Sequence, residues 1–141
     1  MLLVLAARAP WTPAPVARIL IILGYLGALV VLWLNRAQRW CQVVLLGTAL
    51  NTAAILANAG RMPVGRPALE RIDGPLSVAL KAGADPRHVL AGPSTPLGFL
   101  GDQVAVGGWG GGLIVSPGDV VLAFGIAGLV QAAMRGEDSS A

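Results

Sequence analysis

The stretch from Val16 to Leu34 most limits the folds open to this chain, because it is a nearly unbroken run of Ile, Leu, Val, Ala and Gly. As an α-helix it rises about 1.5 Å per residue, enough to cross a hydrocarbon core of roughly 30 Å. The whole chain is similarly apolar, with 55% hydrophobic and only 12% charged residues among its 141. Soluble domains are far more polar. The sequence therefore predicts an all-α integral membrane protein.

Two further apolar segments complete the single membrane domain that we expect over residues 1–141. The first span, at about 16–34, is followed by a polar turn and a second span at about 40–59. So short a connection makes these two spans an antiparallel helical hairpin. A third, C-terminal span is predicted at about 117–134.

The sequence between the second and third spans is richer in Pro and Gly. Residues 60–97 contain six prolines and nine of the 18 Asp, Glu, Lys, Arg and His residues, which predicts an extramembrane loop with short helices at 67–72 and 75–82. Residues 98–115 are apolar but include the glycine-rich run 107–112, which would be entropically poor as a membrane helix. We expect a re-entrant or interfacial segment there, shielded by protein where it enters the membrane.

The composition limits which partners and cofactors this chain can bind. Ten Lys and Arg face seven Asp and Glu, without a basic run and with few aromatic residues, so no nucleic-acid partner is expected. The basic excess fits membrane lipids as partners and a role in topology. Cys41 is the only cysteine and His88 the only histidine, which excludes an intrachain disulfide, a cysteine-based metal site and bis-histidine haem ligation. Neither a metal nor another cofactor is predicted.

One face of the second span is polar. Thr48, Asn51, Ile55 and Asn58 follow helical spacing, and Arg61 extends the stripe by one turn. An amide in hydrocarbon needs a partner, and a contact with a neighbouring helix contributes about 1 kcal/mol. Alternatively, the stripe lines a polar cavity, with Arg61 at its mouth binding an anion or a lipid headgroup. Arg61 would also offset the dipole at the helix C-terminus.

The third span begins with a helix-start pattern. Ser116 stands at the N-cap, Pro117 at the first helical position and Asp119 three residues after the cap. Capping is therefore a sufficient structural role for Ser116 and Asp119. The positive end of the helix dipole also suits a carboxylate that acts as a base or a cation ligand.

Two groups in the connecting segments add candidate chemistry. Asp102 is a lone acid in an apolar, glycine-rich context, so it is either solvated or buried beside a partner such as Arg61 or His88. If Asp102 and Asp119 converge, they form a carboxylate pair able to share a proton or bind a cation. His88 has the only side chain with an unperturbed pKa near neutrality, and is either a surface residue or a proton carrier.

Several short motifs resemble an uncharacterised bacterial family of small multi-span membrane proteins, domain of unknown function 5317, over about residues 16–134. The similar pieces are Gly47–Asn51, Ala57–Val64 with its Asn-x-Gly-Arg-Met-Pro element, His88, Leu100–Asp102 and Val115–Leu122. Ala59 stands where the family usually has Gly, and members carry additional N-terminal apolar sequence, so from the resemblance we expect that a first helix is missing here.

The resemblance implies an architecture and a multi-pass location in the bacterial cytoplasmic (inner) membrane, but no reaction. It favours a loop outside the cytoplasm, whereas a count of basic residues favours a loop inside. We follow the resemblance on this point.

Three functional hypotheses remain open. The first is a binding or accessory protein with one polar site at the membrane surface. The site would hold a lipid headgroup, a partner membrane protein or a second copy in a homo-oligomer. Its ligand-binding residues would be Asn51, Asn58, Arg61 and Ser116. The second is a membrane-embedded hydrolase or transferase for a lipid or lipid-linked substrate, with Asp102 and Asp119 as base or metal ligands and His88 as proton carrier. The third is a component of an oligomeric transporter.

Overall fold

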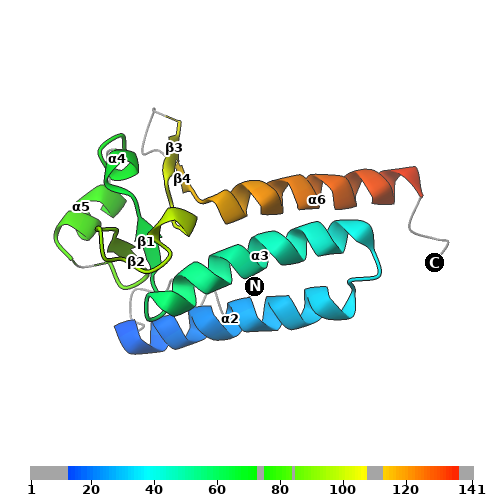
Figure 1. Ribbon diagram of the computed structural model, residues 1–141, viewed down its shortest axis with the longest axis horizontal. Coiled ribbons are helices and arrows are strands. Elements are labelled where there is room, and N and C mark those ends of the chain that lie inside the picture. The colour runs from blue at the N-terminus through cyan, green and yellow to red at the C-terminus, as the bar shows by residue number, and fades with distance from the viewer. Residues whose placement is uncertain (1–12, 73–74, 84, 108–112, 137–141) are drawn as a thin grey trace.

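Three long helices run side by side, and a small cap of short strands and helices lies at one end of them (Figure 1). This computed structural model describes residues 13–72, 75–83, 85–107 and 113–136. Helix α3 lies between the other two long helices and packs against both. The bounds of the three are α2 Ala14–Leu34, α3 Arg39–Ala57 and α6 Pro117–Arg135.

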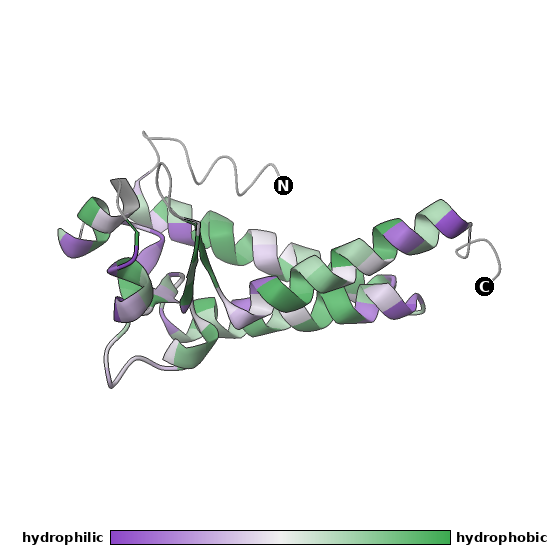
Figure 2. Ribbon diagram, turned by 90° about the horizontal axis from the view of Figure 1, so that it is seen from above, coloured by the Kyte–Doolittle hydropathy of each residue, from purple (hydrophilic) through white to green (hydrophobic). Residues whose placement is uncertain are grey.

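Each long helix has the length and apolar character needed to cross a membrane. The predicted hairpin and C-terminal helix are confirmed as helices, with ends within two residues of those expected. Figure 2 shows hydrophobic residues along much of the three helices and hydrophilic residues gathered in the cap and at the opposite helix ends. That the helices lie in a membrane stays a prediction.

The end of α3 shows how the chain turns into the cap. Asn58 caps the helix, and then Ala59 and Gly60 adopt left-handed backbone conformations with φ of 53° and 81°. Glycine adopts such a conformation at little steric cost, whereas alanine does not. This geometry is a physical reason for the glycine expected at position 59 from the family resemblance.

The cap contains two small sheets. Strand β1 (Met62–Val64) pairs in parallel with β2 (His88–Leu90), so that Met62 lies opposite His88. Strands β3 (Val104–Val106) and β4 (Leu113–Val115) form an antiparallel pair. The remaining elements of the cap are the short helices α4 (Arg66–Leu69) and α5 (Pro75–Lys81) and the 3-10 helix η1 (Gly98–Leu100).

Two apolar cores hold the parts together. The first joins the long helices to the cap and consists of Ala17, Ile21, Ala54, Ile55 and Met62. The second lies within the cap and consists of Val64, Ala68, Leu69, Ile72, Leu80 and Ile114. Because Met62 and Val64 belong to the same strand, β1 connects the two cores.

The cap differs from the sequence expectation. The described chain is mostly helical rather than all-α, because it also contains four short strands. The sequence analysis does not predict them, since three-residue strands are too short to show periodicity. Helix α4 covers Arg66–Leu69 instead of 67–72, while α5 agrees with the expected 75–82. The described part of 98–115 forms η1 and the β3–β4 pair, and its position relative to a membrane stays a prediction. Residues 108–112 of the glycine-rich run lie outside the described residues.

Candidate functional site

His88 lies at the start of β2 and faces two carboxylates. In the turn before it, Asp85 Oδ1 accepts hydrogen bonds from the backbone N–H groups of Arg87 and His88, at 2.7 and 3.0 Å. An aspartate that bonds the backbone two and three residues ahead forms a rigid local turn. His88 Nδ1 lies 3.2 Å from the same oxygen, within ion-pair distance but without hydrogen-bond geometry. Asp85 is thus fixed beside one edge of the imidazole.

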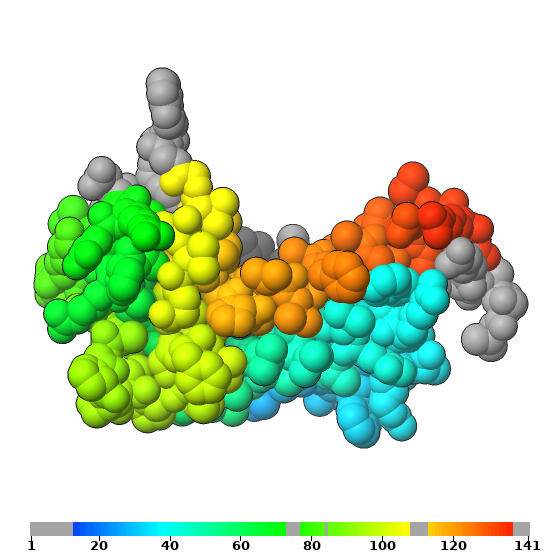
Figure 3. Space-filling model, turned by 45° about the horizontal axis from the view of Figure 1, so that its top comes forward, coloured from blue at the N-terminus to red at the C-terminus, as the bar shows by residue number. Residues whose placement is uncertain are grey.

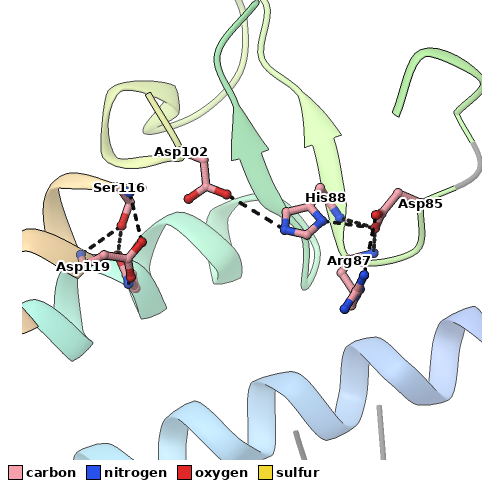
Figure 4. Close-up of polar contacts among 7 residues, drawn as sticks. Asp85, Arg87, His88, Asp102, Ser116 and Asp119 are labelled. Atoms are coloured by element: carbon pink, nitrogen blue, oxygen red, sulfur yellow. Dashed lines mark hydrogen bonds and ion pairs between the residues drawn. The ribbon is translucent and has the colours of Figure 1, made fainter. Parts of the chain in front are cut away.

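Asp102 lies on the other side of the imidazole, with its Oδ2 3.9 Å from His88 Nε2 (Figure 4). Strand β1 sets this position, because the Asp102 N–H donates to Pro63 O and the Gly65 N–H donates to Asp102 O, both at 2.8 Å. A Cβ at Gly101 would overlap the Pro63 carbonyl, so this close approach requires glycine. Strand β1 therefore has His88 along one edge and Asp102 along the other.

The pKa values of Asp102 and Asp85 are shifted in opposite directions. Burial raises the pKa of Asp102 to about 7; the nearby His88 partly opposes this rise, and the charge of Asp119 adds to it. Burial also acts to raise the pKa of Asp85, but the His88 imidazole and the Arg87 backbone N–H outweigh it and lower the pKa to about 2. Near neutral pH one carboxylate is ionised, while the other exchanges a proton.

A second polar cluster joins α3 to the start of α6. Ser116 and Asp119 form the predicted capping box: the Asp119 N–H donates to Ser116 Oγ and the Ser116 N–H donates to Asp119 Oδ2. Asn51 Nδ2 donates to Asp119 Oδ1 at 2.7 Å, and Ser116 Oγ donates to Asn51 Oδ1 at 2.8 Å. Asn51 and Ser116 are each only 1% exposed. These bonds give both ends of the Asn51 amide a partner within the protein.

The two clusters lie next to each other. Figure 4 shows the Asp102 carboxylate between His88 and the corner formed by Ser116 and Asp119. The structure thus brings together five of the seven candidate residues predicted from the sequence, which are Asn51, His88, Asp102, Ser116 and Asp119.

The other two predicted residues have different surroundings. Asn58 Nδ2 donates to the carbonyls of Ala54 and Pro96, both at 2.8 Å, which ties the end of α3 to the cap. Arg61 Nε is buried and has no hydrogen-bond partner among the described residues. Asp85 was not predicted, although an acid directly before Pro86 and three residues before the only histidine was a recognisable turn signal.

The chemistry available to this site is acid–base chemistry. The side chains of His88 and Asp102 are 21% and 11% exposed, so a reacting group can approach from the surface. Within the described residues, no cluster of three or more His, Cys, Asp and Glu side chains has the arrangement of a metal site.

The fold and the site together define a class: a small, mostly helical protein with three helices of membrane-spanning length and a protonatable site within its cap. The chain belongs to the family of unknown function DUF5317, whose sequence model matches residues 1–131. The expected family resemblance is thereby confirmed. No curated protein and no solved structure matches the chain.

Proposed function

We propose that this protein is a multi-pass protein of the bacterial cytoplasmic membrane that catalyses hydrolysis or group transfer on a lipid or lipid-linked substrate. The three apolar helices support the membrane location. The position of the cap at one end of these helices supports a site at the membrane surface, where lipid headgroups are accessible (Figure 1). The loop then lies outside the cytoplasm and the α2–α3 turn inside.

The observation that carries the proposal is the placement of His88 between Asp85 and Asp102. A carboxylate beside one ring nitrogen of an imidazole orients the ring and stabilises its protonated form, while the other ring nitrogen gives or takes a proton. Asp85 has the orienting role because two backbone N–H groups fix it. His88 Nε2 and Asp102 are the proton-transferring pair, since proton transfer is most effective when the pKa lies near the operating pH.

Asp119 has a different role in this scheme. Each of its carboxylate oxygens accepts a hydrogen bond, one from Asn51 and one from the Ser116 backbone. The carboxylate is therefore held in place and acts as a fixed negative charge that favours protonation of Asp102. Asn51 and Ser116 are positioning residues, because they act through Asp119.

The proposal is tested with purified protein in vesicles that contain one labelled lipid at a time. The lipids carry a carboxylic ester, a phosphodiester or a pyrophosphate bond, and release of water-soluble product is measured from pH 5 to 9. We expect at least one bond type to be cleaved. Because general acid–base catalysis contributes about 100-fold or more, Asp102→Asn and His88→Gln should each lose at least that factor.

A matched control is Arg36→Gln, which changes a charge at the opposite end of the helices, where the Arg36 guanidinium stacks on Trp33. This variant should keep full activity. Asp85→Asn should retain part of the activity with a shifted pH profile, as expected for a positioning residue. If none of the three bond types is cleaved at any pH, or if Asp102→Asn is as active as the original protein, the proposal is wrong.

A second candidate function is binding of an anionic headgroup, and the specific observation in its favour is Arg61. A buried guanidinium nitrogen without a partner is costly, and an anionic ligand would satisfy it. Under this alternative the protein is a binding or accessory protein, and Arg61→Gln should lose co-purifying anionic lipid while Arg66→Gln, at an exposed cap position, should not. Equal lipid content in both variants would refute it.

A further inference from the structure

Three arginines meet where the cap joins the first long helix. Arg18 lies in the second turn of α2, and its Nε donates to the carbonyl of Pro86 at 3.3 Å. A Cβ built on Gly60 would lie 2.9 Å from Arg18 Cβ, so this side chain also lies against Gly60. Arg61 follows Gly60 and Arg87 follows Pro86. Arg18 therefore lies beside the residue that precedes each of the other two arginines.

The backbone of the cap brings Arg61 and Arg87 together. They stand directly before β1 and β2, which pair in parallel, and the Met62 N–H donates to Arg87 O at 2.7 Å. Figure 4 shows the Arg87 side chain on the opposite side of the His88 imidazole from Asp102. The arginine junction, formed by Arg18, Arg61 and Arg87, thus lies next to the acid–base site, on its Asp85 side.

The negative charge at the arginine junction does not balance its three guanidinium groups. Arginine stays charged at any physiological pH. Among the described residues, the one carboxylate paired with the junction is Asp85, whose Oδ2 lies 3.8 Å from Arg87 Nη2. Arg61 Nε is buried and has no hydrogen-bond partner there, which is costly for a guanidinium nitrogen. Asp73 lies outside the described residues. The junction is therefore suited to an anion.

We infer that the arginine junction is a phosphate subsite of the proposed enzyme and that the substrate carries a phosphate group. Guanidinium groups bind phosphate through charge-assisted and often bidentate hydrogen bonds. The role of this phosphate as part of a substrate rests on the proposed function. Because proton transfer takes place on the Asp102 side of the imidazole, the phosphate anchors the substrate and holds the neighbouring group beside His88 Nε2.

The position of the junction favours a phosphate that belongs to a lipid. Arg18 lies four residues after the start of α2, which is about 6 Å along the helix. Figure 3 shows the cap (green to yellow) and the last turns of α6 (red) at opposite ends of the molecule, so the junction is at the cap end. Under the proposed membrane location, this is the level of the lipid headgroups. A soluble phosphate compound offers the same chemistry, and the experiment separates the two sources.

The test measures thermal unfolding of the full chain, stripped of lipid, in an uncharged maltoside detergent. The three probes are phosphatidic acid, diacylglycerol with the same acyl chains, and inorganic phosphate. A ligand that binds the folded state raises Tm. We expect phosphatidic acid to raise Tm at concentrations where diacylglycerol and inorganic phosphate have no effect. If inorganic phosphate acts at the same concentration as phosphatidic acid, the lipid source is wrong.

Substitutions assign the binding to the arginine junction. Arg18→Gln and Arg87→Gln should each weaken the binding of phosphatidic acid by about tenfold or more, since each removes a hydrogen bond between charged groups. Both residues are partly exposed and belong to neither apolar core, and Tm without ligand checks that each variant is folded. Arg18→Lys keeps the charge and should have an intermediate effect. The matched control Arg71→Gln removes an exposed charge of the cap and should bind normally.

Failure of this inference is distinguishable from failure of the proposed reaction. Binding of phosphatidic acid that depends on Arg18 and Arg87, without cleavage of any lipid, supports the subsite and refutes the reaction. Ester cleavage in diacylglycerol at the same rate as in phosphatidic acid refutes the subsite and leaves the reaction standing. The subsite is also refuted if phosphatidic acid and diacylglycerol change Tm equally, or if Arg71→Gln weakens binding as much as Arg18→Gln.

Discussion

Replacing Asp102 with Asn tests the electrostatics of the site most directly. Asp102 is 7% exposed, and burial raises its pKa from 3.8 to about 7. The folded protein therefore binds a proton that the unfolded chain has already released between about pH 4 and pH 7. A raised pKa stabilises the folded state below the unfolded pKa, and this contribution is lost as the pH rises through the folded value.

The size of the effect follows from the shift. At about 1.36 kcal/mol per pKa unit, a rise of roughly three units corresponds to about 4 kcal/mol in the limit, of which about 3 kcal/mol is lost between pH 5 and pH 8. For a chain of this size 1 kcal/mol changes Tm by about 2–4 °C. The Tm of the original protein should thus fall by roughly 6–12 °C more than that of Asp102→Asn over this range.

The assay is thermal unfolding in detergent micelles, followed by circular dichroism at each pH. Infrared spectroscopy supplies a second readout, because a protonated carboxyl band that titrates near pH 7 should be absent from Asp102→Asn. Glu70→Gln is a matched control, since Glu70 is an exposed acid in the same cap. Parallel Tm curves for Asp102→Asn and the original protein would show that Asp102 is ionised when folded, and the proton-transfer scheme would lose its basis.

Three further predictions concern stability and use the same unfolding assay. Gly118→Ala should lower the free energy of unfolding by about 1–3 kcal/mol, because its Cβ would overlap Asn51 Oδ1. The control Gly27→Ala should cost nothing, since no atom lies within 4 Å of its Cβ. Equal effects of the two substitutions would refute the close approach of α3 and α6. Ala59→Gly should raise stability by about 1 kcal/mol by relieving a φ of 53°, and a loss of stability would contradict that geometry. Asp85→Asn should lower the free energy of unfolding by up to about 2 kcal/mol at pH 7. The difference from the original protein should vanish as the pH falls through about 2, because a carboxylate with a lowered pKa stabilises the folded state fully only above its unfolded pKa. A difference that does not change with pH would assign the loss to packing.

The long helices were predictable because their signal is local. An apolar run of some 20 residues has few alternatives, and the Ser116–Asp119 pattern placed the start of α6 at the residue where the structure has it. The strands of the cap were not predictable in the same way. Each has only three residues, too few to show periodicity, and β1 pairs with a strand far along the chain, Met62 with His88, which no local pattern records.

The candidate site was predicted as a set of residues but not as a set of contacts. The stripe through Asn51 lies on α3, but no local pattern distinguishes a ligand from Asp119, 68 positions away, as the partner of its amide. The position of Asp102 beside His88 depends on the hydrogen bonds across β1, and therefore on the fold of the whole cap. Such long-range pairings follow from topology, which a single sequence does not reveal.

The hydrogen bonds between Asn51 and the start of α6 also determine when the site can form during synthesis. Helix α3 leaves the ribosome before the cap, and Asp119 follows only after the cap is complete, since 68 positions separate it from Asn51. In the proposed orientation, the cap must cross the bilayer before α6 is inserted. A chain interrupted before α6 would carry His88 and Asp102 without the fixed charge that favours protonation of Asp102. Under the proposed membrane location, insertion of the last helix is the step that completes the acid–base site, so a partly inserted chain would lack it.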